Sequence, residues 1–161
     1  MDIIDVGGES TRPGHVQITE EEEIARVVPV IKKLKEEFDI PVSIDTYKSA
    51  VAAAAIEAGA DLVNDIWGLK YDPEMAGLIA RTGVACCLMH NRDNTEYQEL
   101  LTDFMEDMRA CVELAKNAGI ADDKIILDPG VGFGKTYEMN LEIIDKLEIM
   151  KELGYPVTSW N

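Results

Sequence analysis

Short apolar runs alternate with amphipathic stretches along the whole chain. Runs of this length, bounded by glycine, proline or polar residues, are typical of strands that are buried on both faces. The pattern therefore predicts six strands, the last of them weak: Ile3–Val6, Val42–Ile44, Leu62–Val63, Val84–Leu88, Ile125–Leu127 and Val157.

Between the strands, apolar residues recur with the period of a helix. Thr19 and Glu22 form a capping box before the first predicted helix, and we interpret the acidic run 20–23 as its solvated first turn. One face of that helix carries Ile24, Val27, Val28, Ile31 and Leu34. Four more helices are predicted: Ala50–Ala58 closed by Gly59, one starting at Asp72-Pro73, one opened by a capping box of Thr95 and Gln98, and one carrying Ile143, Ile144, Leu147 and Met150 before Gly154.

Strict alternation of strands and helices predicts a parallel sheet with right-handed crossovers. A doubly wound open sheet and a β/α barrel both satisfy the pattern. With 161 residues and no visible linker or repeat, residues 1–161 are expected to form a single domain.

Charge and composition narrow the function. The net charge of −16 argues against a nucleic-acid-binding surface and against docking on anionic membrane, because both need a basic patch. No signal peptide and no apolar run of membrane-spanning length is visible, so a cytoplasmic protein is expected. Cys86 and Cys87 are adjacent in a strand and point to opposite faces, so with Cys111 they are interpreted as core residues.

Polar clusters follow the strands. In a β/α barrel these strand ends converge on one face, where such proteins build their sites. A single polar residue after a strand is often a cap, and this plainer role applies best to Thr46 and Asp65. The clusters are 5–12, 45–48, 64–66, 89–91 and 128–136.

The last cluster contains Gly130, Gly132 and Gly134. Their spacing is not that of a dinucleotide fingerprint, and a phosphate loop ending at Lys135 would need glycine where Pro129 stands. We expect the glycines to let backbone approach a flat ligand, with Phe133 as a stacking face. Carboxylates and an amide facing one cavity suit a heterocycle rich in N–H donors, and Asp45, Asn64 and Asp128 are the candidates.

Together, the clusters resemble the dihydropteroate synthase family. The matching motifs are GGESTRPG (7–14), SIDTYK (43–48), NDI (64–66), LMH (88–90) and DPGVGFGKT (128–136). The resemblance implies a (β/α)8 TIM-barrel fold and the condensation of 6-hydroxymethyl-7,8-dihydropterin diphosphate with p-aminobenzoate. Diphosphate is released, and Mg²⁺ is the implied cofactor on that diphosphate.

The resemblance also implies roles for individual residues. Substrate-binding residues, carried over by motif, are Thr11, Arg12, Asp45, Asn64, Ile66, Met89, Asp128 and Phe133. Catalytic roles fall to Asp45, which stabilises a cationic pterin methylene, and to Arg12 in a substrate-closing loop. No metal-ligating residue is carried over.

The matching motifs correspond to about strands 2–7 of the eight-stranded barrel, so the chain is expected to form an incomplete barrel whose open edges favour a homo-oligomer. Only Arg12 and Lys48 supply positive charge near the expected site, so an inactive chain is one possibility. A non-catalytic pterin-binding or interaction fragment therefore stays an alternative. The pterin-binding domain of a corrinoid methyltransferase is a further alternative, against which GGESTRPG argues.

Overall fold

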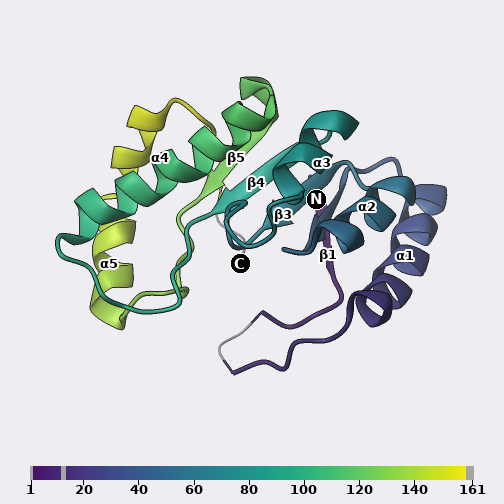
Figure 1. Cartoon of the computed structure of the whole chain (residues 1–161), viewed down its shortest axis with the longest axis horizontal. Helices are drawn as coiled ribbons and strands as arrows, with labels where there is room; N and C mark the ends of the chain where they lie inside the picture. Colours follow the sequence, from purple (N-terminus) through teal and green to yellow (C-terminus); the bar gives the residue numbers. More distant parts are fainter. Residues whose placement is uncertain (1, 12–13, 159–161) are drawn as a thin grey trace.

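The computed structural model describes residues 2–11 and 14–158. Its sheet contains five parallel strands in the order β1-β2-β3-β4-β5, each paired with the next in sequence (Figure 1). The order never reverses as it does in a doubly wound sheet, so the described part of the chain forms an incomplete β/α barrel. The strands are β1 (Ile4–Gly7), β2 (Val42–Asp45), β3 (Leu62–Asp65), β4 (Ala85–Met89) and β5 (Ile125–Asp128).

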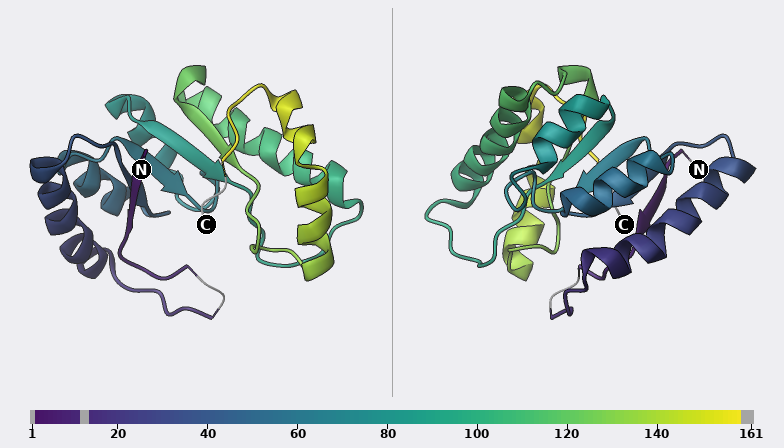
Figure 2. Two further views of the ribbon diagram at one scale, coloured as in Figure 1. Left: turned by 180° about the vertical axis from the view of Figure 1, so that it is seen from behind. Right: turned by 45° about the vertical axis from the view of Figure 1, so that its right-hand side comes forward.

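Helices cover the outer face of the curved sheet, as the two further views in Figure 2 show. The main core lies between this face and the helices, where Ile44, Val63 and Leu88 from the sheet meet Ile31 and Met108 from the helices. The helices are α1 (Glu20–Glu37), α2 (Ser49–Glu57), α3 (Met75–Thr82), α4 (Leu100–Ala118) and α5 (Tyr137–Asp145), with 3-10 turns η1 (Asp122–Lys124) and η2 (Leu147–Leu153).

The predicted sixth strand is reduced to one bridge. Val157 pairs in parallel with Leu127, and the Leu127 amide donates to Pro156 O at 2.9 Å while the Thr158 amide donates to Leu127 O at 2.9 Å. Pro156 has no N–H of its own to extend the ladder. Within 2–11 and 14–158, the sheet therefore has five strands rather than six.

Two predicted helix starts were wrong. Helix α4 begins at Leu100, with Glu99 rather than Thr95 as its cap, because the Glu99 carboxylate accepts from the Thr102 amide at 2.8 Å. Helix α3 begins at Met75, three residues after Asp72. The Asp72 carboxylate accepts from the Glu74 amide at 2.9 Å in the turn before α3, and its other oxygen accepts from the Ser49 amide at 2.7 Å at the start of α2.

The last predicted helix is two elements. Helix α5 ends at Asp145 and the 3-10 turn η2 follows, so the predicted apolar face is broken between them. Ile143 and Met150 are buried, whereas Ile144 is 52% exposed. A change in helical pitch rotates successive residues differently, which the uniform 3.6-residue pattern did not anticipate.

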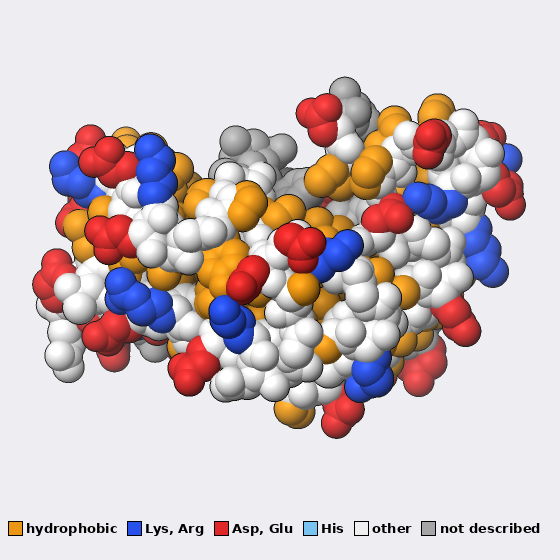
Figure 3. Space-filling view, turned by 90° about the horizontal axis from the view of Figure 1, so that it is seen from above, with side chains coloured by type: hydrophobic (Ala, Val, Ile, Leu, Met, Phe, Trp, Pro, Cys, Tyr) orange, Lys and Arg blue, Asp and Glu red, His pale blue; other side chains and the backbone are white. Residues whose placement is uncertain are grey.

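Surface charge is mixed rather than segregated. In the view from above (Figure 3), Lys and Arg side chains are interspersed with Asp and Glu, and no broad basic patch appears on this face. Among residues 2–11 and 14–158, no helix is long and apolar enough to cross a membrane. Cys86, Cys87 and Cys111 are all free and buried, in line with their interpretation as core residues.

Candidate functional site

The segments that follow the strands enclose a cavity of about 180 Å³ at the carboxyl end of the sheet. Every predicted substrate-binding residue that the structure describes lines it, whereas the predicted Arg12 lies outside the described residues. Asp5, which begins the first polar cluster but was not among the predicted substrate-binding residues, joins them. The cavity is lined by Asp5, Thr11, Asp45, Asn64, Ile66, Met89, Asp128, Gly130, Val131 and Phe133.

The two-residue repeat of the strands explains this gathering. Asp45 at the end of β2 pairs in register with Asn64 of β3, and Met89 of β4 pairs with Asp128 of β5. Alternate residues such as Ile44 point the other way, into the core under the helices. The parallel register therefore brings polar side chains from separate motifs to one end of the barrel interior.

Two acceptor atoms in this cavity are buried without a hydrogen-bond partner, Asp45 Oδ1 and Asn64 Oδ1. The Asn64 amide is oriented by Asp5, to which its Nδ2 donates at 3.4 Å. A buried acceptor without a partner costs about 1–3 kcal/mol. A ligand that presents N–H groups at these two oxygens recovers this free energy, so the cavity is chemically matched to a donor-rich edge.

The ionised form of Asp45 is also destabilised in the cavity. Burial, with the nearby carboxylates of Asp5 and Glu23 as further causes, raises the pKa of Asp45 to about 7. A ligand that donates hydrogen bonds to the ionised carboxylate lowers this pKa again. Asp45 is therefore a group whose ionised form is more stable with a donor ligand than without one.

The other carboxylates at this end have local partners. Asp128 is only 3% exposed, and its Oδ1 accepts from the Gly130 amide at 2.7 Å. Asp65 accepts from the amides of Trp67 at 2.8 Å and Leu69 at 3.0 Å, so it shapes the turn after β3. This is the plain structural role that the sequence left open for Asp65, and it is not among the cavity-lining residues.

The apolar side of the cavity is a small separate cluster. Ile66 and Met89 are buried there with Tyr47, and Trp67 and Phe133 pack against them. Carboxylates and an amide on one side and flat or flexible apolar side chains on the other suit a planar ring with polar edges.

Two glycines of the last motif, Gly130 and Gly134, are also required by close packing against protein backbone. A Cβ on Gly130 would lie 1.9 Å from His90 O, and one on Gly134 would lie 2.7 Å from Arg92 O. Both glycines also have positive φ, 65° and 57°. They let the loop after β5 pack on the backbone of the loop after β4, while Gly130 also lines the cavity, as expected for backbone that approaches a ligand.

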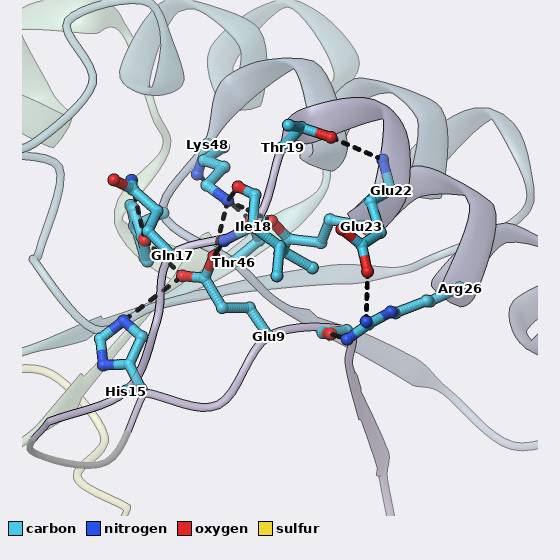
Figure 4. A network of polar contacts seen from close by, with 12 residues as sticks. Glu9, His15, Gln17, Ile18, Thr19, Glu22, Glu23, Arg26, Thr46 and Lys48 are labelled. Atoms are coloured by element: carbon cyan, nitrogen blue, oxygen red, sulfur yellow. Dashed lines mark hydrogen bonds and ion pairs between the residues drawn. The ribbon is translucent and has the colours of Figure 1, made fainter.

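The buried carboxylate of Glu9 anchors the base of the loop after β1 (Figure 4). Glu9 Oε1 accepts from the Ile18 amide at 2.8 Å and from Lys48 Nζ at 2.9 Å, and Glu9 Oε2 accepts from the Tyr47 hydroxyl. Lys48 Nζ also donates to Ile18 O at 2.9 Å and to Glu23 Oε2 at 2.7 Å. These contacts hold both ends of the segment that carries Thr11 over the cavity.

This cluster corrects two expectations. Glu23 is 1% exposed, so it is buried rather than part of a solvated first turn. The Lys48 ammonium binds the carboxylates of Glu9 and Glu23 rather than being free to bind a substrate. Burial alone would lower the pKa of Lys48, but the hydrogen bonds and charges of Glu23 and Glu9 outweigh it and raise that pKa. No local pattern signals this contact, because Glu9 and Lys48 are 39 residues apart.

Magnesium has no evident protein cage in this part of the chain. Within 2–11 and 14–158, no group of three or more His, Cys, Asp or Glu side chains is arranged to hold a metal ion. The Mg²⁺ implied by the family resemblance therefore does not fit the described side chains as a protein-held ion.

Comparison with known proteins gives one consistent family. The model of the pterin binding enzymes matches residues 1–159. A dihydropteroate synthase of Clostridium beijerinckii is 65% identical over 156 residues, which are 97% of this chain and 58% of the relative. One of Bacillus subtilis is 52% identical over 155 residues, 96% of this chain and 54% of the relative.

Solved structures agree. A dihydropteroate synthase of Clostridium difficile, crystallised in the presence of pteroic acid, matches with a TM-score of 0.96 and 49% identity, covering 98% of this chain and 60% of that one. One of Xanthomonas albilineans with 4-aminobenzoic acid matches with a TM-score of 0.94 and 36% identity, covering 98% of this chain and 58% of that one.

The chain belongs to the pterin-binding enzyme family, and its similarity to dihydropteroate synthases confirms the resemblance predicted from the motifs. It spans between 54% and 60% of the length of the relatives described above. For this chain, the activity and substrates of those longer proteins are therefore proposals.

Proposed function

We propose that this chain is the pterin-binding part of a dihydropteroate synthase, a transferase of folate biosynthesis. The observation that carries the proposal is the pair of buried, unpartnered acceptors Asp45 Oδ1 and Asn64 Oδ1 in a cavity that also holds Asp128 and Phe133. A pterin offers amino and ring N–H groups along one edge and a flat ring for the apolar side. Its donors satisfy the acceptors that the protein leaves unpaired.

In the proposed reaction, the bond between the pterin methylene carbon and the diphosphate oxygen breaks, and diphosphate leaves with the electron pair. The amino nitrogen of p-aminobenzoate then bonds to that carbon and loses a proton. The ionised Asp45 stabilises the positive charge on the pterin methylene, while Asn64, Asp128, Ile66, Met89 and Phe133 hold the ring. Thr11 and Arg12 are assigned to the arylamine side of the site.

A second function is favoured by the contacts of two buried lysines. Lys48 and Lys135 both lie at the carboxyl end of the sheet, yet each donates three hydrogen bonds to protein groups. Neither ammonium has a hydrogen left to stabilise a departing diphosphate. This supports a chain that binds pterin without turnover. The comparisons above favour either reading over a corrinoid methyltransferase domain.

Calorimetry with 6-hydroxymethylpterin tests the binding site directly. We expect Asp128→Asn to weaken binding roughly 10- to 100-fold, because a charge-assisted hydrogen bond is worth about 1.5–3 kcal/mol. Asp39→Asn, an exposed carboxylate far from β5 in sequence, serves as the matched control and should leave the affinity unchanged. Equal affinity in the native chain and Asp128→Asn would remove Asp128 from the site.

Turnover is tested separately, with pterin diphosphate, p-aminobenzoate and Mg²⁺, by following dihydropteroate formation. Product above a heat-inactivated control assigns the synthase activity to this chain. Binding without product assigns it the non-catalytic role. A cytoplasmic location, a homo-oligomeric state and Mg²⁺ on the substrate diphosphate are parts of the proposal that rest on the sequence and the resemblance.

A further inference from the structure

A series of hydrogen-bonded polar side chains lies behind the cavity wall formed by Gly130, Val131 and Phe133. Its inner end is Lys135, which is only 9% exposed. Lys135 Nζ donates to Gly130 O at 2.9 Å, to Phe133 O at 2.9 Å and to His90 Nδ1 at 2.8 Å. All three hydrogens of the ammonium are thereby used, and two of them hold the backbone of the cavity wall.

The acceptor role of His90 fixes the rest of the series. His90 is fully buried, and burial lowers its pKa to about 4, so the ring is neutral near pH 7. Because Nδ1 accepts from Lys135, the ring proton lies on Nε2, which donates to Asp107 Oδ2 at 3.0 Å. The same Asp107 oxygen accepts from Arg92 Nε at 2.6 Å. Lys135 is thus connected through His90 to helix α4.

A second contact braces the same wall from outside. The Tyr97 hydroxyl donates to Gly134 O at 2.7 Å, and the Tyr97 ring lies under the Arg92 guanidinium, 4.2 Å from its carbon. With the close backbone packing at Gly130 and Gly134, these contacts join the loop after β4 to the loop after β5. The two loops therefore present one rigid surface to the cavity.

The buried ammonium is costly to keep. Its three hydrogen-bond acceptors are all neutral, and a buried charge held by neutral groups is disfavoured. Burial lowers the pKa of Lys135 to about 7, with Asp128 and Asp107 opposing this effect and Lys70 and Arg92 adding to it. A methionine or leucine would fill the space without that cost, so the packing alone gives no reason for a lysine here.

We propose that Lys135 is a positioning residue that sets the Phe133 ring and the Gly130 backbone against the pterin, with His90 and Asp107 fixing the direction of its hydrogen bonds. The inference rests on the proposed function for its ligand. The geometry that carries it, two carbonyls of the cavity wall held by one buried ammonium, belongs to the protein alone.

A double-mutant cycle tests the positioning role. Lys135→Met keeps the length of the side chain and removes the ammonium, and we expect it to weaken 6-hydroxymethylpterin binding at least 10-fold by calorimetry. Phe133→Ala should weaken binding about 10-fold in the native chain but less than threefold in Lys135→Met, because the ring is already misplaced there. Effects that multiply as independent losses would overturn the proposal, whereas Lys124→Met, an exposed lysine beside β5, should leave the affinity within twofold.

A readout without ligand separates this inference from the proposed function. The Phe133 amide donates to Gly130 O at 3.1 Å and the Gly130 amide donates to Asp128 Oδ1, so both amides should be protected from hydrogen exchange. Lys135→Met should speed their exchange at least 10-fold, while Lys124→Met should not. Unchanged exchange overturns the positioning role even where no pterin binds. If the native chain does not bind pterin but Lys135→Met speeds the exchange of these amides, the proposed function is overturned and the positioning role of Lys135 is supported.

If Lys135→Met does not fold, Tyr97→Phe takes its place. This change removes only the hydroxyl that donates to Gly134 O, and Tyr97 is partly buried in a surface loop. We expect faster exchange of the Phe133 amide and a measurable coupling to Phe133→Ala, both two- to threefold. Absence of both effects would overturn the proposal.

Discussion

The Asp45→Asn variant should become increasingly more stable than the native protein as the pH rises, although the substitution removes a central residue of the candidate site. The pKa of this carboxyl is raised from 3.8 to about 7, mainly by burial. Between these two values the unfolded chain loses its proton while the folded chain keeps it, so stability falls as the pH rises. The contribution is fully present below 3.8 and is lost as the pH rises through about 7.

The size of the effect follows from the same difference. A change from 3.8 to about 7 corresponds to about 4 kcal/mol, of which about 2 kcal/mol is lost between pH 5.5 and 8.5. Part of the Asp45 side chain reaches solvent, so we expect about 1–2 kcal/mol over this range. Starting at pH 5.5 keeps the protein above its isoelectric point of about 4.4.

The assay is urea unfolding at several pH values, followed by far-ultraviolet circular dichroism. Asp45→Asn minus native should give a free-energy difference that grows with pH in favour of the variant. Asp39→Asn, whose carboxylate is exposed, should give a difference that does not change with pH. If the curves of Asp45→Asn and the native protein run parallel from pH 5.5 to 8.5, Asp45 is an ordinary ionised carboxylate and the account of the cavity as a charged, unsatisfied site is wrong.

Two further predictions concern the walls of the site. Lys48→Met should lower the free energy of unfolding by about 3–5 kcal/mol, because it leaves Glu9 and Glu23 buried without their cation. The exposed control Lys32→Met should change the free energy of unfolding by less than about 0.5 kcal/mol. A loss below about 1 kcal/mol for Lys48→Met would contradict a stabilising role for the ion pairs of Lys48 with Glu9 and Glu23. Gly130→Ala and Gly132→Ala both place a side chain at positive φ, which costs about 1–2 kcal/mol, but only at Gly130 would the Cβ collide with backbone, 1.9 Å from His90 O. Urea unfolding should therefore show a markedly larger loss for Gly130→Ala, and equal losses would mean that the loop relaxes freely away from His90.

Local patterns predicted the elements well where burial and local sequence agree. All five strands of the sheet were predicted, with ends shifted by one or two residues, and Thr19 caps α1 as its motif indicates. The predicted start of α4 was wrong because contacts of Arg92, which the capping-box pattern does not include, hold the preceding segment. Arg92 is engaged by Asp107 and by Glu96 O, so the segment that contains Thr95 remains a loop and Glu99 becomes the cap.

The residues of the candidate site also differ in whether the local sequence could place them. Residues that end a strand could be placed from the sequence, because parallel strands carry them to one edge whatever the details of packing. Asp5 was placed in the first polar cluster but not among the substrate-binding residues, because it lies inside the first strand, before the GGESTRPG motif from which roles were carried over. The contacts of Glu9 with Lys48 and of Lys135 with His90 were missed because the partners are 39 and 45 residues apart, and no periodicity encodes such pairs.

The charges at the carboxyl end of the sheet are arranged for one kind of ligand. Asp45 and Asn64 each leave an acceptor unpaired inside the cavity, whereas Lys48 and Lys135 are fully occupied by protein groups. A ligand rich in N–H donors pairs with these two acceptors and does not need the lysines, whereas an anion would face the unpaired acceptors and find no free ammonium hydrogen. The described part of the chain thus matches a donor-rich planar ring, such as the pterin proposed above, and the printed contacts of its two buried lysines go to protein groups.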